Sequence, residues 1–227
     1  MSYSFKKFYK VWALIASILN LLGLGVALHY GTTLPWIIGS ALVYGFFIAC
    51  IPAHIPKWSW LIGYANWVSV TRLFIIIVLF ILYPFLDNII LFTLFLVAIC
   101  LDGVDGYFAR RFGHNSEVGG ELDMEIDGFM VLVLSWIHVD QQNLGWLILI
   151  PGGIKYGIEI LFFWLSRKEK DLMPKKYKAG IGVSFFLTLL LPFVTNDSFL
   201  MLLPYGSGVL IIFSFMVTTF YQLNILK

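Results

Sequence analysis

The sequence predicts an all-α protein that crosses a membrane about eight times, because apolar segments of spanning length follow one another along the chain. Apolar residues make up 60% of the 227 residues and charged residues only 12%, so the chain has more hydrophobic surface than a water-soluble domain of this size can bury. Windows of about 20 mostly apolar residues, the length that a spanning helix needs, leave little room for a soluble domain. We expect a single membrane domain and no nucleic-acid partner.

Turn-forming residues separate the predicted spans. Gly31, Pro84 and Pro174 are typical of helix ends, and polar residues accompany each of these breaks. The first apolar run is too long for the core of a secretory signal, so we interpret it as the first span. The eight spans are expected at about residues 9–29, 35–53, 68–86, 88–107, 120–139, 144–166, 178–195 and 199–222.

The distribution of charge predicts the orientation of these spans. Lys and Arg are retained on the cytoplasmic side of a membrane when they lie in short loops. With the N-terminus inside, the cytoplasmic segments hold the basic residues, six of them in 167–178, whereas the opposite loops hold Asp87, Asp140 and Asp197. Both termini are therefore expected in the cytoplasm. Two further basic residues lie within predicted spans, where a charge is costly and often functional.

Four aspartates form the most informative pattern. Asp102 and Asp105 are three residues apart, so a helix presents both carboxylates on one face. Asp123 and Asp127, four residues apart, do the same on a second helix. Four converging carboxylates repel one another unless cations lie between them, and oxygen ligands without His or Cys indicate Mg²⁺ or Mn²⁺. Two such ions suit phosphoryl chemistry. The alternative is that these acids only cap helix ends, but capping needs one acid per helix end and not two pairs.

Small and basic residues accompany the aspartates. Gly106, Ala109 and Gly119 lack the side chains that would keep a helix or a phosphate at a distance. Arg110 is placed one turn beyond the first acidic pair, where its planar fork can pair with a phosphate. Glu125 points away from the face of the second pair, so we expect it to be solvated or structural rather than catalytic.

These residues together resemble the signature of the CDP-alcohol phosphotransferase family, D-x-x-D-G-x-x-A-R-x8-G-x3-D-x3-D, and every fixed position is met. A weaker match to the family's N-x-x-[TS]-x-x-R covers Asn66, Ser69 and Arg72, with Ala65 where a proline commonly stands. The resemblance implies a six-helix catalytic core over residues 65–227 and two additional transmembrane helices over residues 1–64.

The resemblance also implies a role for each matching residue. Asp102, Asp105 and Asp123 would ligate two Mg²⁺ or Mn²⁺ ions. Asp127 would lie at the second ion and serve as the catalytic base. A homodimer is expected from the resemblance alone. The residues expected to bind the nucleotide and its diphosphate are Asn66, Ser69, Gly106, Ala109, Arg110 and Gly119.

Basic residues outside the signature are candidates for an acceptor pocket. Lys155 could line this pocket, or it could simply neutralise Glu159 one turn away. The basic loop 167–178 could equally serve only orientation and contact with anionic lipids. The complete set of candidates is Arg72, Lys155, Lys175 and Lys178.

The sequence thus predicts an integral membrane enzyme of phospholipid synthesis that transfers a phospho-alcohol group from a CDP-linked donor to an alcohol and releases CMP. CDP-diacylglycerol is the favoured donor and a small polar alcohol the favoured acceptor, because the short chain resembles the compact phosphatidyl-transferring members. Transfer from CDP-choline or CDP-ethanolamine to a lipid alcohol is the alternative, and an ion-coupled transporter is an alternative of another class. We expect the active site at the cytoplasmic face of a bacterial inner membrane.

Overall fold

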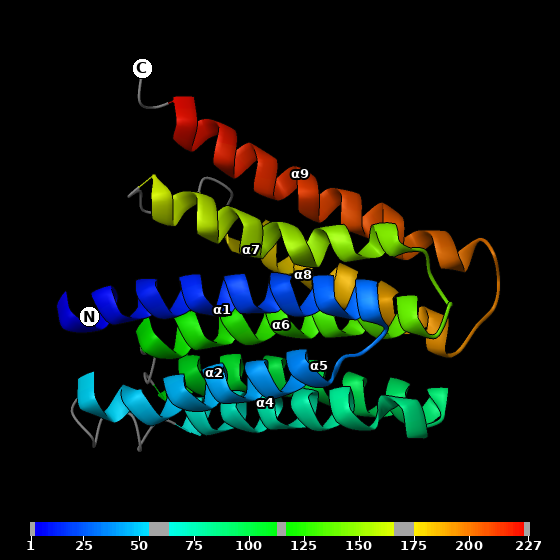
Figure 1. Ribbon diagram of the computed structural model, residues 1–227, viewed down its shortest axis with the longest axis horizontal. Coiled ribbons are helices and arrows are strands. Elements are labelled where there is room, and N and C mark those ends of the chain that lie inside the picture. Colours follow the sequence, from blue (N-terminus) through cyan, green and yellow to red (C-terminus); the bar gives the residue numbers. More distant parts are fainter. Residues whose placement is uncertain (1–2, 55–63, 113–116, 166–174, 225–227) are drawn as a thin grey trace. The chain divides into compact units, whose positions relative to one another are not determined.

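The computed structural model describes the backbone of residues 3–54, 64–112, 117–165 and 175–224, and the side chains of 5–52, 67–103, 119–165 and 180–219. Within these ranges the chain is all-helical, which confirms the predicted fold class (Figure 1). The α-helices are Tyr3–Tyr30 (α1), Leu34–His54 (α2), Tyr64–Leu82 (α4), Asn88–Phe112 (α5), Glu117–Asp140 (α6), Leu149–Trp164 (α7), Lys175–Leu190 (α8) and Leu203–Asn224 (α9), and short 3₁₀ helices lie at Tyr83–Phe85, Trp146–Ile148, Leu191–Phe193 and Leu200–Leu202.

Each predicted span overlaps one of these helices, with ends that differ by several residues in places. Many large apolar side chains face outward, among them Leu42 and Phe74, which are 67% and 68% exposed, as is typical of a surface that water does not solvate. The count of eight membrane crossings remains a prediction. Within the described residues, five segments are long and apolar enough to cross a membrane: Phe5–Tyr30, Leu34–Pro52, Trp67–Phe85, Trp146–Trp164 and Leu200–Thr219.

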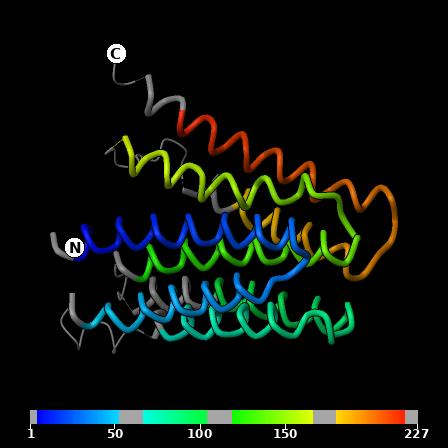
Figure 2. The backbone as a smooth tube through the Cα atoms, viewed as in Figure 1, coloured from blue at the N-terminus to red at the C-terminus, as the bar shows by residue number. Residues whose placement is uncertain are grey.

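A short turn joins α1 to α2 and makes an antiparallel helical hairpin (Figure 2). Gly31 ends α1 with a φ of 66°, a left-handed conformation that glycine adopts without steric cost. Its N–H donates to the carbonyl of Ala27 over 2.9 Å. The predicted break at Gly31 is therefore a glycine cap.

Polar groups fix the pairing of α1 and α2. Asn20 of α1 is buried, and its Oδ1 accepts hydrogen bonds from Trp36 Nε1 over 3.0 Å and from Ser40 Oγ over 3.2 Å. Gly23 gives the indole its space, since a Cβ there would lie 2.4 Å from the ring of Trp36. A shift of one helix along the other would break these bonds and leave a buried amide without partners. The bonds therefore stabilise one register of α1 against α2.

The chain forms two compact units. The first contains Met1–Leu86 and Thr93–Asp127. Within it, α2 packs on both α1 and α4. Trp36 of α2 meets Phe80 of α4 edge to face, with ring centroids 4.9 Å apart. The predicted division of the chain after residue 64 remains a prediction.

The second unit contains Asp87–Phe92 and Gly128–Lys227. Within it, α9 packs on α7 and α8, and Gly208 permits a close approach because a Cβ there would lie 3.0 Å from Pro151 and 3.3 Å from Phe185. His138 near the end of α6 is buried, with Nε2 2.6 Å from the carbonyl oxygen of Leu189. This bond ties α6 to the end of α8.

Candidate active site

Three aspartates of the signature meet in the first unit. α5 supplies Asp102, and α6 supplies Asp123 and Asp127. The two acids of α6 are four residues apart, so they project from one face of that helix. One carboxylate oxygen of each of the three residues lies within 4.8 Å of the other two. The two helices thus gather the oxygen ligands that a hard divalent cation prefers.

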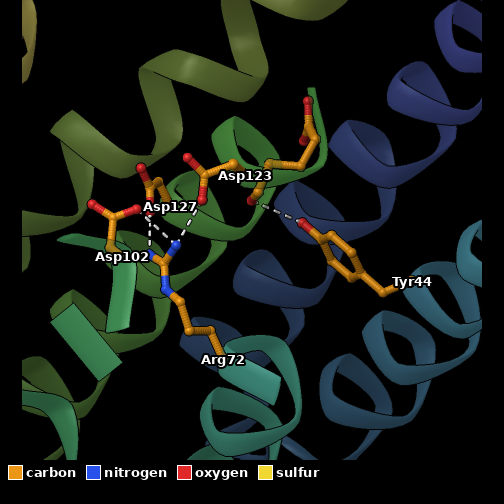
Figure 3. A network of polar contacts seen from close by, with 6 residues as sticks. Tyr44, Arg72, Asp102, Asp123 and Asp127 are labelled. Atoms are coloured by element: carbon orange, nitrogen blue, oxygen red, sulfur yellow. Dashed lines mark hydrogen bonds and ion pairs between the residues drawn. The ribbon is translucent and has the colours of Figure 1, made fainter. Parts of the chain in front are cut away.

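Arg72 of α4 lies among these three acids (Figure 3). Its Nη1 donates to Oδ1 of Asp102 over 2.8 Å and to Oδ1 of Asp123 over 2.6 Å. Its Nη2 donates to Oδ1 of Asp127 over 2.6 Å. A guanidinium can serve several carboxylates at once because its donors form a rigid fork, which a lysine lacks. We refer to these four residues as the aspartate–arginine cluster.

The aspartate–arginine cluster has a buried positive side and a partly open negative side. The side chain of Arg72 is fully buried, whereas those of the three aspartates are each 34% exposed. A buried guanidinium requires nearby countercharge, and these carboxylates supply more than one charge to match it. Three carboxylates and one guanidinium have a formal net charge of −2. The exposed oxygens therefore lie in a field that attracts a divalent cation.

The donor set fits Mg²⁺ or Mn²⁺. Among the described residues, the candidate ligands in this group are carboxylates alone, and such ligands favour hard cations over zinc. Arg72 does not exclude an ion, since the carboxylates that it contacts are still partly exposed. The assignment of the aspartates as ligands, and the number of ions, remain predictions.

The other signature residues lie on the same three helices. Ser69, one turn before Arg72, is buried, and Gly119 lies in the first turn of α6. The predicted contacts of these residues with a nucleotide remain predictions. The helices that carry the remaining candidates are described, whereas the side chains are outside the described residues: Asn66 on α4, and Asp105, Gly106, Ala109 and Arg110 on α5.

The four residues predicted for an acceptor pocket fall into three groups. Arg72 belongs to the aspartate–arginine cluster. Lys175 and Lys178 lie in the first turn of α8, and their side chains are outside the described residues. Lys155 of α7 is buried, and its Nζ lies 3.2 Å from Oε1 of Glu159. This ion pair corresponds to the second of the two predicted alternatives, in which Lys155 and Glu159 neutralise one another. An acceptor-binding role of any of the four remains a prediction.

The sequence interpretation missed the contacts of Glu125. Its side chain is fully buried, so the solvated alternative is wrong and a structural role stands. Tyr9 of α1 donates to its Oε1 over 2.9 Å, and Tyr44 of α2 donates to its main-chain carbonyl over 3.3 Å. An acid in a mostly apolar helix does indicate that some donor must reach it. No spacing rule, however, predicts a partner 116 residues earlier in the chain.

Comparison with known proteins identifies the family of the chain. The family model described as CDP-alcohol phosphatidyltransferase matches residues 62–220, a range that contains all four residues of the cluster. No curated protein and no solved structure matches the chain significantly. The family match covers most of the chain and confirms the resemblance that the motifs indicate. With its apolar helices, the chain is a membrane transferase of phosphate-containing groups, and it belongs to the CDP-alcohol phosphatidyltransferase family.

Proposed function

We propose that this enzyme transfers a phosphatidyl group from CDP-diacylglycerol to a small polar alcohol and releases CMP. The observation that carries the proposal is the aspartate–arginine cluster, in which partly exposed carboxylates lie within 4.8 Å of one another beside a buried cation. Family membership supports a CDP-linked donor. The description of the family as phosphatidyltransferases favours CDP-diacylglycerol as this donor.

The reaction makes one bond and breaks one. The hydroxyl oxygen of the acceptor attacks the donor phosphorus that carries diacylglycerol. The bond from this phosphorus to the oxygen that bridges it to CMP breaks, and CMP leaves with the electron pair. Asp127, the proposed base, takes the hydroxyl proton.

The residues of the chain hold the reactants for this exchange. Arg72 binds three carboxylates at once, so it keeps them directed toward one partly open side. Mg²⁺ or Mn²⁺ held by Asp102, Asp105, Asp123 and Asp127 would supply positive charge that polarises the diphosphate and favours ionisation of the attacking hydroxyl. Arg110 would pair with the diphosphate. The residues proposed to accommodate the nucleotide and diphosphate beside it are Asn66, Ser69, Gly106, Ala109 and Gly119.

The proposed setting is a bacterial inner membrane crossed eight times, with both termini and the aspartate–arginine cluster on the cytoplasmic side. The basic loop 167–178 and the acidic residues Asp87, Asp140 and Asp197 support this orientation. In this arrangement α5, α6 and α8 add three crossings to the five apolar spans. The active form would be a homodimer. Each chain would consist of a six-helix catalytic core at 65–227 and two additional transmembrane helices at 1–64.

Release of CMP tests the proposed reaction. The full-length protein, purified and placed in lipid nanodiscs, is given CDP-diacylglycerol and a panel of acceptors that includes glycerol 3-phosphate, inositol phosphate and serine. CMP is expected only with both substrates and with Mg²⁺ or Mn²⁺ present. Turnover restricted to CDP-choline or CDP-ethanolamine with diacylglycerol would replace the donor assignment. Metal-independent ion flux without CMP release would favour a transporter.

A further inference from the structure

We infer that Glu125 is a positioning residue of the catalytic centre, and that Tyr9 and Tyr44 hold it in place from the two N-terminal helices. Both tyrosines lie outside residues 62–220, the range that the family model matches. In this view α1 and α2 set the orientation of the helix that carries two of the three clustered aspartates. The inference rests on the proposed metal-dependent function.

Glu125 and the clustered aspartates lie on opposite faces of α6. A helix turns by about 100° per residue, so Glu125 lies about 200° around the helix from Asp123 and the same angle back from Asp127. Arg72 contacts the aspartate face, and Tyr9 contacts the carboxylate on the other face. A rotation of α6 about its axis would strain both sets of contacts. Together these contacts fix the direction in which the aspartates point.

The contacts on the Glu125 side are buried and directional. Its side chain is 0% exposed, and Oε1 accepts the hydroxyl of Tyr9 at 2.9 Å. A carboxylate removed from water is costly unless donors reach it, and a hydrogen bond to a charged acceptor is stronger than one between neutral groups. Figure 3 shows Tyr44 reaching α6 from a different helix than Arg72, and its hydroxyl donates to the Glu125 carbonyl over 3.3 Å.

An aromatic cluster orients the two tyrosines. Phe47 of α2 stacks on Trp12 of α1, with ring centroids 4.1 Å apart. The same tryptophan meets Tyr44 edge to face at 5.4 Å, and Phe5 stacks on Tyr9 at 6.4 Å. Phe5, Trp12, Tyr44 and Phe47 are buried. The positions of both hydroxyl groups are therefore determined by the packing of α1 on α2.

Loss of the Tyr9 hydroxyl would affect the metal ligands through α6. Without this donor the buried carboxylate of Glu125 has one hydrogen bond fewer, which favours a movement of α6 that replaces the lost bond with another donor or with water. Such a movement shifts Asp123 and Asp127 together, while Asp102 stays on α5. A metal site loses affinity when its ligands are no longer held at the spacing that the ion needs. The expected signature is weaker metal binding rather than an absent fold.

Direct binding of Mn²⁺ tests this inference without reference to turnover. Free Mn²⁺ is measured by electron paramagnetic resonance during titration of the full-length protein in nanodiscs. Tyr9→Phe and Glu125→Met should each weaken Mn²⁺ binding about tenfold, the lower end of what is measured when a group that supports a metal ligand is removed. Glu125→Gln should stay within about twofold of the wild type, because its amide oxygen can accept the same hydrogen bond.

Ser40→Ala is the matched control. It removes a hydrogen bond that joins α1 to α2 and does not involve α6, so it should lower the melting temperature and leave Mn²⁺ affinity unchanged. Tyr9→Phe removes a single oxygen atom, which keeps the test valid if Glu125→Met does not fold.

The outcomes separate this inference from the proposed function. If the wild type binds Mn²⁺ and releases CMP, but Tyr9→Phe and Glu125→Met bind Mn²⁺ as tightly, the positioning role is overturned and the function stands. An equal loss in Glu125→Gln and Glu125→Met would overturn the hydrogen bond as the cause. A wild type that binds no Mn²⁺ would overturn the proposed function and this inference together.

Discussion

Arg72 and Asp127 form an ion pair of 2.6 Å that joins α4 to α6. The same guanidinium reaches Asp102 and Asp123, so it connects all three described acids of the signature. Arg72 ends the motif N-x-x-[TS]-x-x-R, whereas the three aspartates belong to the acidic signature. The two motifs are therefore parts of one cluster, in which the arginine of the first supplies countercharge for the acids of the second.

Replacement of Arg72 by Met should destabilise the metal-free protein and impair the enzyme. Removal of one partner of a buried ion pair costs about 3–5 kcal/mol, and the lower end applies here because the remaining carboxylates are partly exposed. The charge-assisted hydrogen bonds of Arg72 also hold the aspartates in place. CMP release should therefore fall by about tenfold or more, which corresponds to a loss of about 1.4 kcal/mol of transition-state stabilisation. Melting temperatures in detergent and CMP assays check the two effects.

Replacement of Arg72 by Met should also change how strongly metal stabilises the protein. Without Arg72 three carboxylates face one another, so Mn²⁺ should raise the melting temperature more in Arg72→Met than in the wild type. Arg72→Lys should recover part of the lost stability, because an ammonium retains the charge without the planar fork. An unchanged response to Mn²⁺ in Arg72→Met would mean that the ion does not bind at these aspartates.

Replacement of Asp102, Asp105 or Asp123 by Asn should abolish or nearly abolish CMP release. The amide keeps the shape of the side chain and removes the anionic ligand, so added Mg²⁺ should rescue little activity. Glu121→Gln makes the same chemical change on α6 outside the signature and serves as the control. Normal turnover of Asp105→Asn in the same lipid system would contradict the two-ion proposal.

Local features of the sequence were sufficient to predict the helices. Gly31 has a positive φ that ends α1, and Pro84 lies in the 3₁₀ helix Tyr83–Phe85 that follows α4. Such effects act within one turn, so their positions can be read from neighbouring residues. The acidic start of α6 extends to Glu117, three residues before the predicted span, because helix formation does not require apolar residues.

Contacts between distant segments could not be predicted in this way. Helical spacing indicated that Asp123 and Asp127 share a face, since both lie on one helix. The ion pairs of Arg72, however, join residues 30, 51 and 55 positions apart, and they depend on how α4, α5 and α6 pack. Periodicity reports which face of a helix is apolar, not which helix covers it.

Replacement of His138 by Phe should destabilise the second unit without altering Mn²⁺ affinity. His138 Nε2 lies 2.6 Å from the carbonyl oxygen of Leu189, and the side chain is fully buried. With Nε2 protonated, His138 donates this bond, and Phe leaves the carbonyl without that donor at a cost of about 1–3 kcal/mol. A lower melting temperature with unchanged Mn²⁺ titration is expected. Weaker Mn²⁺ binding would instead connect this bond to the catalytic centre.

Cysteine accessibility should place residue 140 and the segment 167–178 on opposite sides of the membrane. The positive charge of 167–178 favours the cytoplasmic side, whereas Asp140, the last residue of α6, borders a loop without Lys or Arg. Cys50 and Cys100 are free, so both are first replaced by Ser to give a background without native thiols. A membrane-impermeant reagent added to intact cells should label a cysteine at 140 and spare one at 170. Labelling of both positions from the same side would refute the orientation.

Lys175 and Lys178 should matter only for an acceptor that carries a phosphate. Both lie at the start of α8, in the C-terminal part of the basic segment 167–178, where an ammonium can bind a phosphate as a point charge. With glycerol 3-phosphate or inositol phosphate as acceptor, Lys175→Ala or Lys178→Ala should raise the KM for the acceptor about tenfold, the effect of losing about 1.4 kcal/mol of binding. With serine, which has no phosphate, the KM should not change. Lys168→Ala, a neighbouring substitution with the same loss of charge, should leave both values unchanged. An equal effect of all three substitutions on both acceptors would indicate that the loop serves lipid contact and orientation, and the acceptor site would then have to be sought elsewhere.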